Sequence, residues 1–306
     1  MIVSIEVPAS IGNVGPGFDV LGLAVGDLHD TILMERTEGA SFVEMIKGCD
    51  AETIPMEAER NTVTLAAAAM AKILRANIAV KVTIARAIPA SGGLGASAAS
   101  SLAGALGVAA LLGRKVLDEH IFMASLEAEA AVSGRHLDNL APCLFGGLTI
   151  ALGTEPPRAI RVPVDASWWV AVVTPAFRLE TRVARGVLPE SLPRTEWVRQ
   201  MALSAATVTA LRDGNRELLR EVLHDPFAEP RRKALIPNFD LVKAAALSSG
   251  ALGASISGAG PSVFAIFDDE TSARRGRDAM ARAFGETSLA HVGQVADRGA
   301  TVKIMS

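Results

Sequence analysis

The sequence predicts a two-domain α+β protein, and three observations carry this prediction. The chain has 306 residues, against roughly 150 residues for a typical domain. Its apolar pattern switches repeatedly between the period of a strand and the period of a helix. Gly153–Pro157 contains paired prolines, which interrupt both helix and sheet, so we expect an interdomain linker between residues 1–155 and 156–306.

The elements of the first domain follow from apolar alternation and from capping residues. Strands are expected at Met1–Val7, Thr31–Arg36, Ser41–Lys47, around Val80, Val82 and Ile84, and at Leu144–Leu152. Helices are expected from an Asn61 cap to Ala76, from the end of a glycine-rich loop to Leu112, and from an Asp118 cap to a point near Gly134.

The second domain mixes strands and helices in a different order. Strands are expected at Trp168–Val173, at Val263–Phe267 and once or twice near the end. Helices are expected at Glu196–Arg212, Asn215–Leu223, after Asn238 and at Thr271–Phe284. This order suits an α+β sandwich, for which a ferredoxin-like arrangement is the simplest choice.

Composition excludes several classes of protein. Hydrophobic residues make up 50% of the chain, enough for a large core. Lys and Arg (30) nearly balance Asp and Glu (33), which argues against a nucleic-acid binder. The two cysteines lie far apart in the sequence, which favours a reducing compartment, and the first basic residue is Arg36, which argues against a targeting segment. The continuous apolar run Leu102–Leu112 is too short for a membrane-spanning helix. We therefore expect a cytoplasmic protein.

The most informative segment is the glycine-rich stretch Pro89–Ala99. Its three glycines allow a sharp turn and close approach to a ligand, and the small residues after them begin a helix. Free amides and the positive end of a helix dipole would form a phosphate cradle. The loop lacks the Lys of a Walker loop and the third Gly of a dinucleotide fingerprint. A tight turn packed in the core is the alternative, and the residues alone leave both open.

Three further segments carry polar residues, either in loops that contain several glycines or close to acidic residues. Asn13 and Asp19 lie in the loop Pro8–Asp19; Glu127 and Glu129 precede Ser133–Asn139, which holds His136, Asp138 and Asn139; Ser255–Ser262 is a second glycine-rich turn. Each alone also fits an ordinary loop or a solvated helix face.

Together, and in this order, the four segments resemble the GHMP small-molecule kinase superfamily, most closely its homoserine kinases. The phosphate loop of that family has the pattern Pro-x-x-x-Gly-Leu-Gly-Ser-Ser-Ala-Ala, and this chain departs from it at Ala96 while keeping the metal-binding second Ser as Ser97. The resemblance implies an N-terminal, ribosomal S5 domain 2-like domain with a left-handed βαβ unit, against a right-handed preference of roughly 98%. It also implies a ferredoxin-like C-terminal domain.

The resemblance further implies ATP-dependent phosphorylation of the side-chain hydroxyl of L-homoserine, a small-molecule substrate, in threonine biosynthesis. It places ATP on Pro89, Ala90, Ser91, Gly92, Gly93, Leu94, Gly95, Ala96, Ser97, Ala98 and Ala99, and Mg²⁺ on Ser97 and Glu129. It places the substrate on Asn13, Asp19, Asn139, Thr181, Arg185 and Arg232, with Arg231 as the alternative to Arg232, and catalytic roles on Asp138, Asn139 and Arg185. Gly258 and Gly260 match a third motif, expected to back the phosphate loop. The resemblance allows a homodimer and leaves open whether Asp138 is a base.

Three alternatives remain at this point. Another GHMP kinase, acting on mevalonate, shikimate or a sugar, would keep Ser97 and Glu129 without needing paired arginines. A ligand sensor on the same fold would not turn over ATP. A serine hydrolase would use Ser97, in the weak nucleophile-elbow pattern that ends at Ala99.

Overall fold

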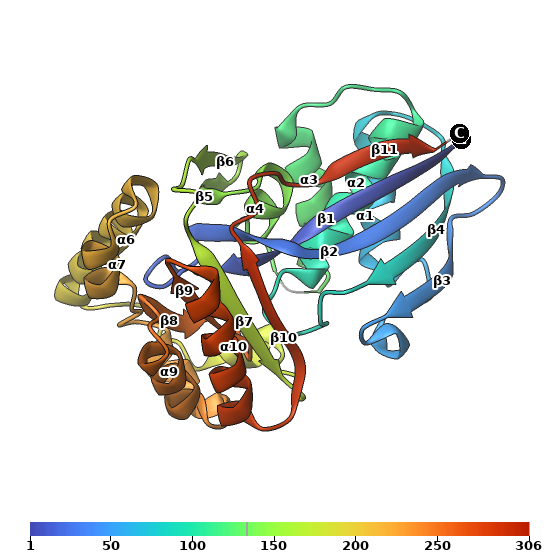
Figure 1. The fold of residues 1–306 in the computed structure, drawn as a ribbon. Helices are drawn as coiled ribbons and strands as arrows, with labels where there is room; N and C mark the ends of the chain where they lie inside the picture. Colours follow the sequence, from blue (N-terminus) through green and yellow to red (C-terminus); the bar gives the residue numbers. More distant parts are fainter. Residues whose placement is uncertain (133, 306) are drawn as a thin grey trace.

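Two β-sheets organise the chain, each with its own helices (Figure 1). The computed structural model describes residues 1–132 and 134–305. Within these residues the first sheet has the order β11–β1–β2–β4–β3, with β5 beside β2 and β6 beside β5. The strands are β1 (Ile2–Gly12), β2 (Leu21–Thr37), β3 (Phe42–Gly48), β4 (Ala79–Arg86), β5 (Leu148–Thr154), β6 (Pro157–Val162) and β11 (Thr301–Met305).

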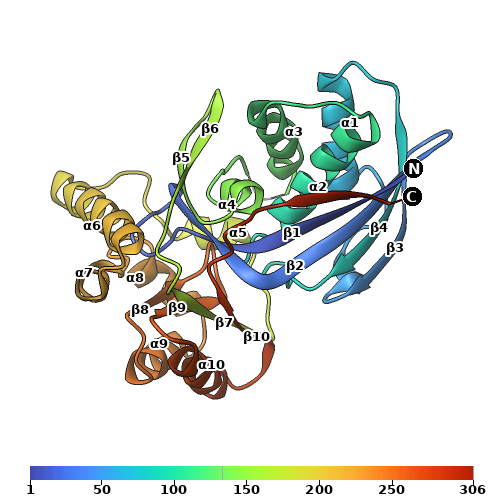
Figure 2. The same ribbon diagram turned by 45° about the horizontal axis from the view of Figure 1, so that its top comes forward.

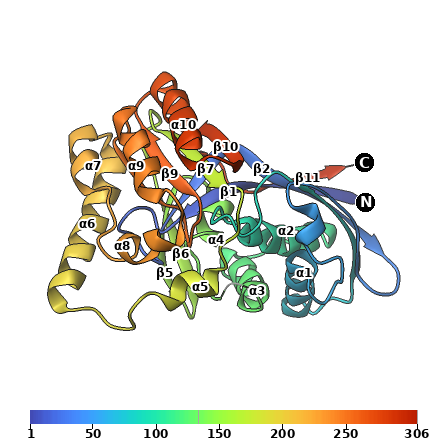
Figure 3. The ribbon, with the colours of Figure 1, turned by 90° about the horizontal axis from the view of Figure 1, so that it is seen from below.

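Helices of the first sheet lie together on one of its faces, as Figure 3 shows for α1, α2 and α3. They are α1 (Thr62–Ile73), α2 (Ala96–Leu111), α3 (Asp118–Ala130) and α4 (Leu140–Phe145), with a 3₁₀ turn at Ala51–Thr53. The uncharged stretch after Ala87 forms the glycine-rich loop and α2, which is buried against α1, α3 and β1. Within the described residues no helix is both long and apolar enough to cross a membrane.

The second sheet has the strand order β10–β7–β9–β8, with antiparallel neighbours throughout. Its strands are β7 (Trp169–Pro175), β8 (Gly253–Ile256), β9 (Val263–Phe267) and β10 (Thr287–Gln294). The helices of this half are α5 (Thr181–Gly186), α6 (Arg194–Asp213), α7 (Arg216–Val222), α8 (Glu229–Arg232), α9 (Phe239–Ser248) and α10 (Glu270–Phe284), and a 3₁₀ turn, η2 (Lys233–Leu235), follows α8. This strand order is that of a split β–α–β fold, so the ferredoxin-like prediction is confirmed.

Most predicted elements are present, and some of their bounds differ from the prediction. β3 and β4 are adjacent and parallel with α1 between them, which gives the expected β–α–β unit. Asn61 caps α1 through the Val63 amide, as predicted. Asp118 was expected as a cap but is the first residue of α3, after Leu117 at the cap position without a side-chain hydrogen bond. α3 ends at Ala130, and Gly134, expected near this end, has φ +100° and donates its amide to the Glu129 carbonyl over 3.1 Å.

The predicted linker Gly153–Pro157 is wrong. It forms the turn of the β5–β6 hairpin, in which Thr154 pairs with Pro157, and both strands belong to the first sheet (Figure 2). The chain passes to the second sheet only between Val162 and Trp169. Division by sheet membership would therefore place a boundary there instead of at 155/156. β11 then returns to the first sheet, where Met305 pairs with Ile2.

Candidate active site

A cavity of about 460 Å³ opens where the glycine-rich loops of the two halves meet. This volume lies in the range of small-molecule sites. Its walls come from the loop before α2, the end of α3, the turn before α4, the first turns of α5, and α8. They consist of Asn13, Pro89, Ser91, Gly92, Gly93, Gly95, Ala96, Ser97, Ala98, Glu129, Val132, His136, Asp138, Asn139, Glu180, Thr181, Arg182, Arg185, Arg232, Gly258 and Ala259.

The predicted phosphate loop leads directly into the N-terminus of α2. Gly95 is the cap residue, with φ +72° and no side-chain cap, so the first amides of the helix face the cavity without a capping partner. Aligned amides and the helix dipole favour an anion at this point. Ala90, Leu94 and Ala99 do not line the cavity: Ala90 donates its N–H to Asp50, and Leu94 and Ala99 are fully buried.

The second glycine-rich turn supports this loop from behind. Ser257 Oγ donates to the Gly93 carbonyl over 2.7 Å, and the Ser262 amide donates to the Gly92 carbonyl over 3.1 Å. Gly93 has φ +80°, and a Cβ there would lie 2.3 Å from the Ser257 carbonyl oxygen. Only glycine allows the two turns to approach this closely. The prediction that the Gly258–Gly260 motif backs the loop is therefore confirmed.

An oxygen pair suited to a hard cation lies at the start of α2. The Ser97 hydroxyl donates to the Glu129 carboxylate across the cavity wall. Glu129 is buried, whereas Glu127, two residues earlier, faces solvent. Magnesium takes one or two protein carboxylate or hydroxyl oxygens and completes its shell with phosphates and water. Within the described residues no larger cluster of acidic, His or Cys ligands occurs. Ser97 and Glu129 therefore fit such an ion.

Opposite the phosphate loop, charged residues gather around one aromatic ring. Asp19 forms a bidentate ion pair with Arg185, with contacts of 3.0 and 2.5 Å. The guanidinium groups of Arg185 and Arg232 lie 5.4 and 5.3 Å from the centre of the Phe18 ring. A cation near an aromatic face is stabilised by the ring quadrupole. Phe18 thus helps to keep two like charges close to each other.

The structure distinguishes Arg232 from Arg231. Arg232 is buried and donates from Nε to the Ala184 carbonyl (2.9 Å) and from Nη1 to the Gly258 carbonyl (3.0 Å). Burial, and then the nearby Arg185, lowers the Arg232 pKa to about 10, so it remains charged at neutral pH. Arg231 donates to the Phe227 carbonyl and lies outside the cavity walls. Arg232 is the cavity residue of the two.

Asp138 and Asn139 both line the cavity, and their side-chain ends come together at Gly12, where a Cβ would lie 2.4 Å from Asp138 Oδ2 and 2.5 Å from Asn139 Nδ2. Burial, reinforced by Asp19, raises the pKa of Asp138 to about 7, and Arg185 acts in the opposite direction. The Asn139 Oδ1 accepts from Ser10 Oγ (3.0 Å) and lies 3.2 Å from the point a Gly95 Cβ would occupy. Asp138 therefore belongs to the charged end, and Asn139 lies closer to the phosphate loop.

The structure brings most predicted site residues to this cavity and adds some. Asp19 reaches it through Arg185, and the Asn13 side chain holds the Gly258 carbonyl (2.7 Å) and the Asp19 amide (2.8 Å). His136 lines the wall, and burial lowers its pKa. His136 belongs to one of the candidate segments of the sequence, but no role was predicted for it. Thr181 and Arg185 of α5 line the cavity as predicted, whereas their neighbours Glu180 and Arg182 were missed because the resemblance assigned roles only to Thr181 and Arg185 in this segment. Ser133 lies outside the described residues.

Comparison with known proteins agrees with this geometry. The GHMP kinases N-terminal domain matches residues 61–147, and the GHMP kinases C-terminal domain matches residues 207–286. Homoserine kinase of Thermococcus gammatolerans is 40% identical over 87% of this chain and 88% of its own. Homoserine kinase of Xylella fastidiosa is 39% identical over 90% of this chain and 85% of its own. The crystal structure of homoserine kinase from Cytophaga hutchinsonii has a TM-score of 0.92 and 32% identity, covering 99% and 97% of the two chains. The chain therefore belongs to the homoserine kinase family of the GHMP kinases.

Proposed function

We propose that this kinase transfers the γ-phosphoryl group of ATP to the side-chain hydroxyl of L-homoserine, giving O-phospho-L-homoserine for threonine biosynthesis. One observation carries the proposal: a single cavity joins the helix N-terminus at Gly95 to two arginines and Asp138, with Asp19 paired to one of these arginines. The first end suits a triphosphate, and the second suits the two charges of an amino acid.

At the phosphate end, positioning and charge neutralisation supply most of the catalysis. The amides of Ala96–Ala98 would hold phosphate oxygens. Ser97 and Glu129 would hold Mg²⁺, which neutralises charge on the phosphates when bound. The close contact between these two side chains already sets their oxygens on one side of the cavity.

At the amino-acid end, Arg232 makes its two carbonyl bonds through Nε and Nη1, and its Nη2 has no hydrogen bond to any of the described residues. This nitrogen, with Arg185 and Thr181, would bind the carboxylate. Asp138 and Asp19 would face the ammonium group. In the structure Asp19 and Arg185 pair with each other. The substrate would therefore exchange this ion pair for two pairs with its own charges.

Between the two ends, Asn139 would orient the hydroxyl. Ser10 occupies its amide oxygen, so the amide nitrogen is the group left to donate to the hydroxyl oxygen. An amide cannot take the proton, but a loose phosphoryl-transfer transition state needs little deprotonation of the nucleophile. We therefore assign Asp138 to the ammonium group and propose no general base.

A coupled ADP-release assay with homoserine, mevalonate, shikimate and galactose tests the substrate. We expect turnover with L-homoserine to exceed that with each other alcohol by at least about 100-fold, because only homoserine offers both charges. Faster turnover of mevalonate or a sugar would overturn the substrate assignment. Absence of turnover with all four would favour the ligand-sensor alternative.

Replacing Arg185 with Leu tests the carboxylate contact. A charge-assisted hydrogen bond contributes about 1.5–3 kcal/mol, so kcat/KM for L-homoserine should fall roughly 10- to 150-fold. The amino alcohol that lacks the carboxylate should lose much less. An equal loss on both substrates would mean that Arg185 acts on the phosphates or through folding. Arg231→Leu, outside the cavity, is the matched control.

A further inference from the structure

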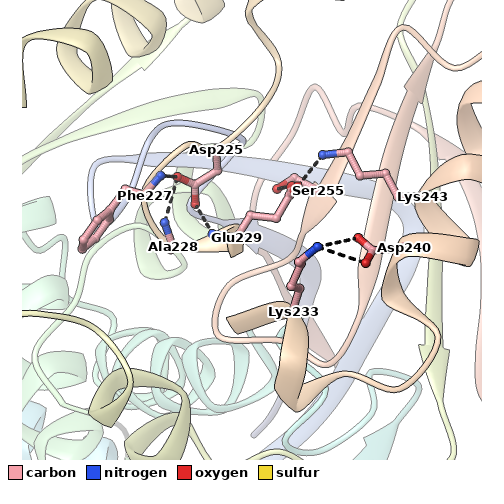
Figure 4. A network of polar contacts seen from close by, with 8 residues as sticks. All are labelled: Asp225, Phe227, Ala228, Glu229, Lys233, Asp240, Lys243 and Ser255. Carbon is pink, nitrogen blue, oxygen red and sulfur yellow. Dashed lines mark hydrogen bonds and ion pairs between the residues drawn. The ribbon is translucent and has the colours of Figure 1, made fainter. Parts of the chain in front are cut away.

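The short helix α8 carries Arg232, and a network of polar contacts surrounds the N-terminal end of this helix (Figure 4). Before the helix, the buried Asp225 carboxylate accepts the amides of Phe227, Ala228 and Glu229 over 2.8, 3.0 and 3.2 Å. A helix of four residues gains little from its own hydrogen bonds. Its position must therefore come from such external contacts.

Glu229 attaches α8 to two neighbouring elements at once. One carboxylate oxygen pairs with Lys243 of α9 (2.5 Å), and the other accepts from Ser255 of β8 (2.8 Å). The Glu229 side chain is only 12% exposed, and Ser255 is buried. A shielded, doubly satisfied carboxylate holds its geometry better than an exposed ion pair does.

The spacing of these contacts links Glu229 to Arg232. The two residues are three apart on α8 and so lie on the same face of the helix. Their partners, Ser255 and Gly258, are also three apart, on β8 and in the turn that follows it. The Glu229–Ser255 and Arg232–Gly258 bonds therefore join α8 at two points to the same segment, residues 255–258.

We propose that Glu229 is a positioning residue for substrate recognition: through Ser255 and Lys243 it sets α8 so that Arg232 presents its Nη2 to the substrate carboxylate. Asp225 supports the same helix from its N-terminal side. This inference rests on the proposed role of Arg232 in binding L-homoserine.

A second ion pair provides a matched control. Lys233, just after α8, pairs with Asp240 of α9 over 3.0 Å, so it also joins this segment to α9 (Figure 4). Both side chains are exposed, at 44% and 74%. Exposed pairs of this kind contribute little, and among the described residues this pair makes no hydrogen bond to β8.

The experiment is a double-mutant cycle of Glu229→Gln and Arg232→Leu, read as KM for L-homoserine, KM for ATP, kcat and melting temperature. Glu229→Gln should raise KM for L-homoserine about tenfold while kcat and KM for ATP change less than twofold. In the Arg232→Leu background the same change should alter KM for L-homoserine less than twofold. Asp240→Asn should leave all four quantities within about twofold or about 2 °C, on the scale typical of surface changes.

The outcomes of this experiment distinguish the positioning role of Glu229 from the proposed role of Arg232 in binding L-homoserine. If Arg232→Leu impairs homoserine binding but Glu229→Gln does not, or if the two effects multiply independently, the positioning role is overturned. If Arg232→Leu leaves KM for L-homoserine unchanged, the proposed role of Arg232 fails, and the inference fails with it. Should Glu229→Gln not fold, Ser255→Ala removes the Glu229–Ser255 bond alone and should raise the same KM several-fold. An equal rise in both KM values would overturn the positioning role in favour of a general structural one.

Discussion

Glu129→Gln is expected to lower kcat roughly 100- to 1,000-fold while the protein stays folded. The substitution preserves shape but removes the negative charge that would hold Mg²⁺ beside Ser97. Charge neutralisation by a metal contributes several kcal/mol in a phosphoryl-transfer transition state, and each 1.4 kcal/mol is about a factor of ten in rate. Steady-state rates at saturating ATP and L-homoserine, across a magnesium titration, check this expectation.

Ser97→Ala should act in the same direction with a smaller effect, because a neutral hydroxyl contributes less than a carboxylate. Both variants should need more Mg²⁺ for half-maximal rate. Glu127→Gln is the matched control, since Glu127 lies on the same helix but faces solvent, and its rate should stay near that of the parent. Normal rates for both site variants at limiting Mg²⁺ would contradict the metal assignment.

Elements with a strong local signal could be predicted from the sequence. The side chains of Asn61 and Asn215 cap α1 and α7 by accepting backbone amides two and three residues later. Such caps depend only on residues that are close in the sequence. Val263–Phe267 is a buried strand with the predicted bounds. The phosphate loop was also visible, because glycines before a small-residue helix restrict the backbone in a recognisable way.

Features that depend on partners distant in sequence could not be predicted. Pro156 and Pro157 indicated a linker, yet strand pairing across the turn makes this segment a hairpin. The four- and six-residue helices α8 and α5 have no period long enough to detect. Nothing local separates Arg231 from Arg232; only the carbonyls of Ala184 and Gly258 select Arg232.

Asp138→Asn is expected to raise KM for L-homoserine roughly 10- to 150-fold with a smaller change in kcat, because it removes a charged partner of the ammonium group. Burial holds the pKa of Asp138 at about 7, and the ammonium binds the ionised form. In the parent, kcat/KM should therefore rise with pH up to about 7 and then level off, and the variant should lose this inflection. If the turnover rate at saturating substrate instead fell by roughly two to four orders of magnitude, Asp138 would be identified as the general base.

The pH dependence of the free energy of unfolding gives an independent check on the Asp138 carboxyl, and the direction of the effect can be derived. Its pKa is raised from 3.8 to about 7 on folding, so between these values the folded state binds more protons than the unfolded state. The free energy of unfolding must then fall as pH rises through this window. A separation of about three pH units corresponds to at most about 4 kcal/mol. Asp138→Asn should therefore be more stable than the parent at about pH 8, and the difference should shrink steadily towards about pH 4. Denaturant-induced unfolding of both proteins at about pH 8 and about pH 4 measures this difference in the free energy of unfolding. If the difference did not change with pH, Asp138 would be ionised in the folded protein across this whole pH range.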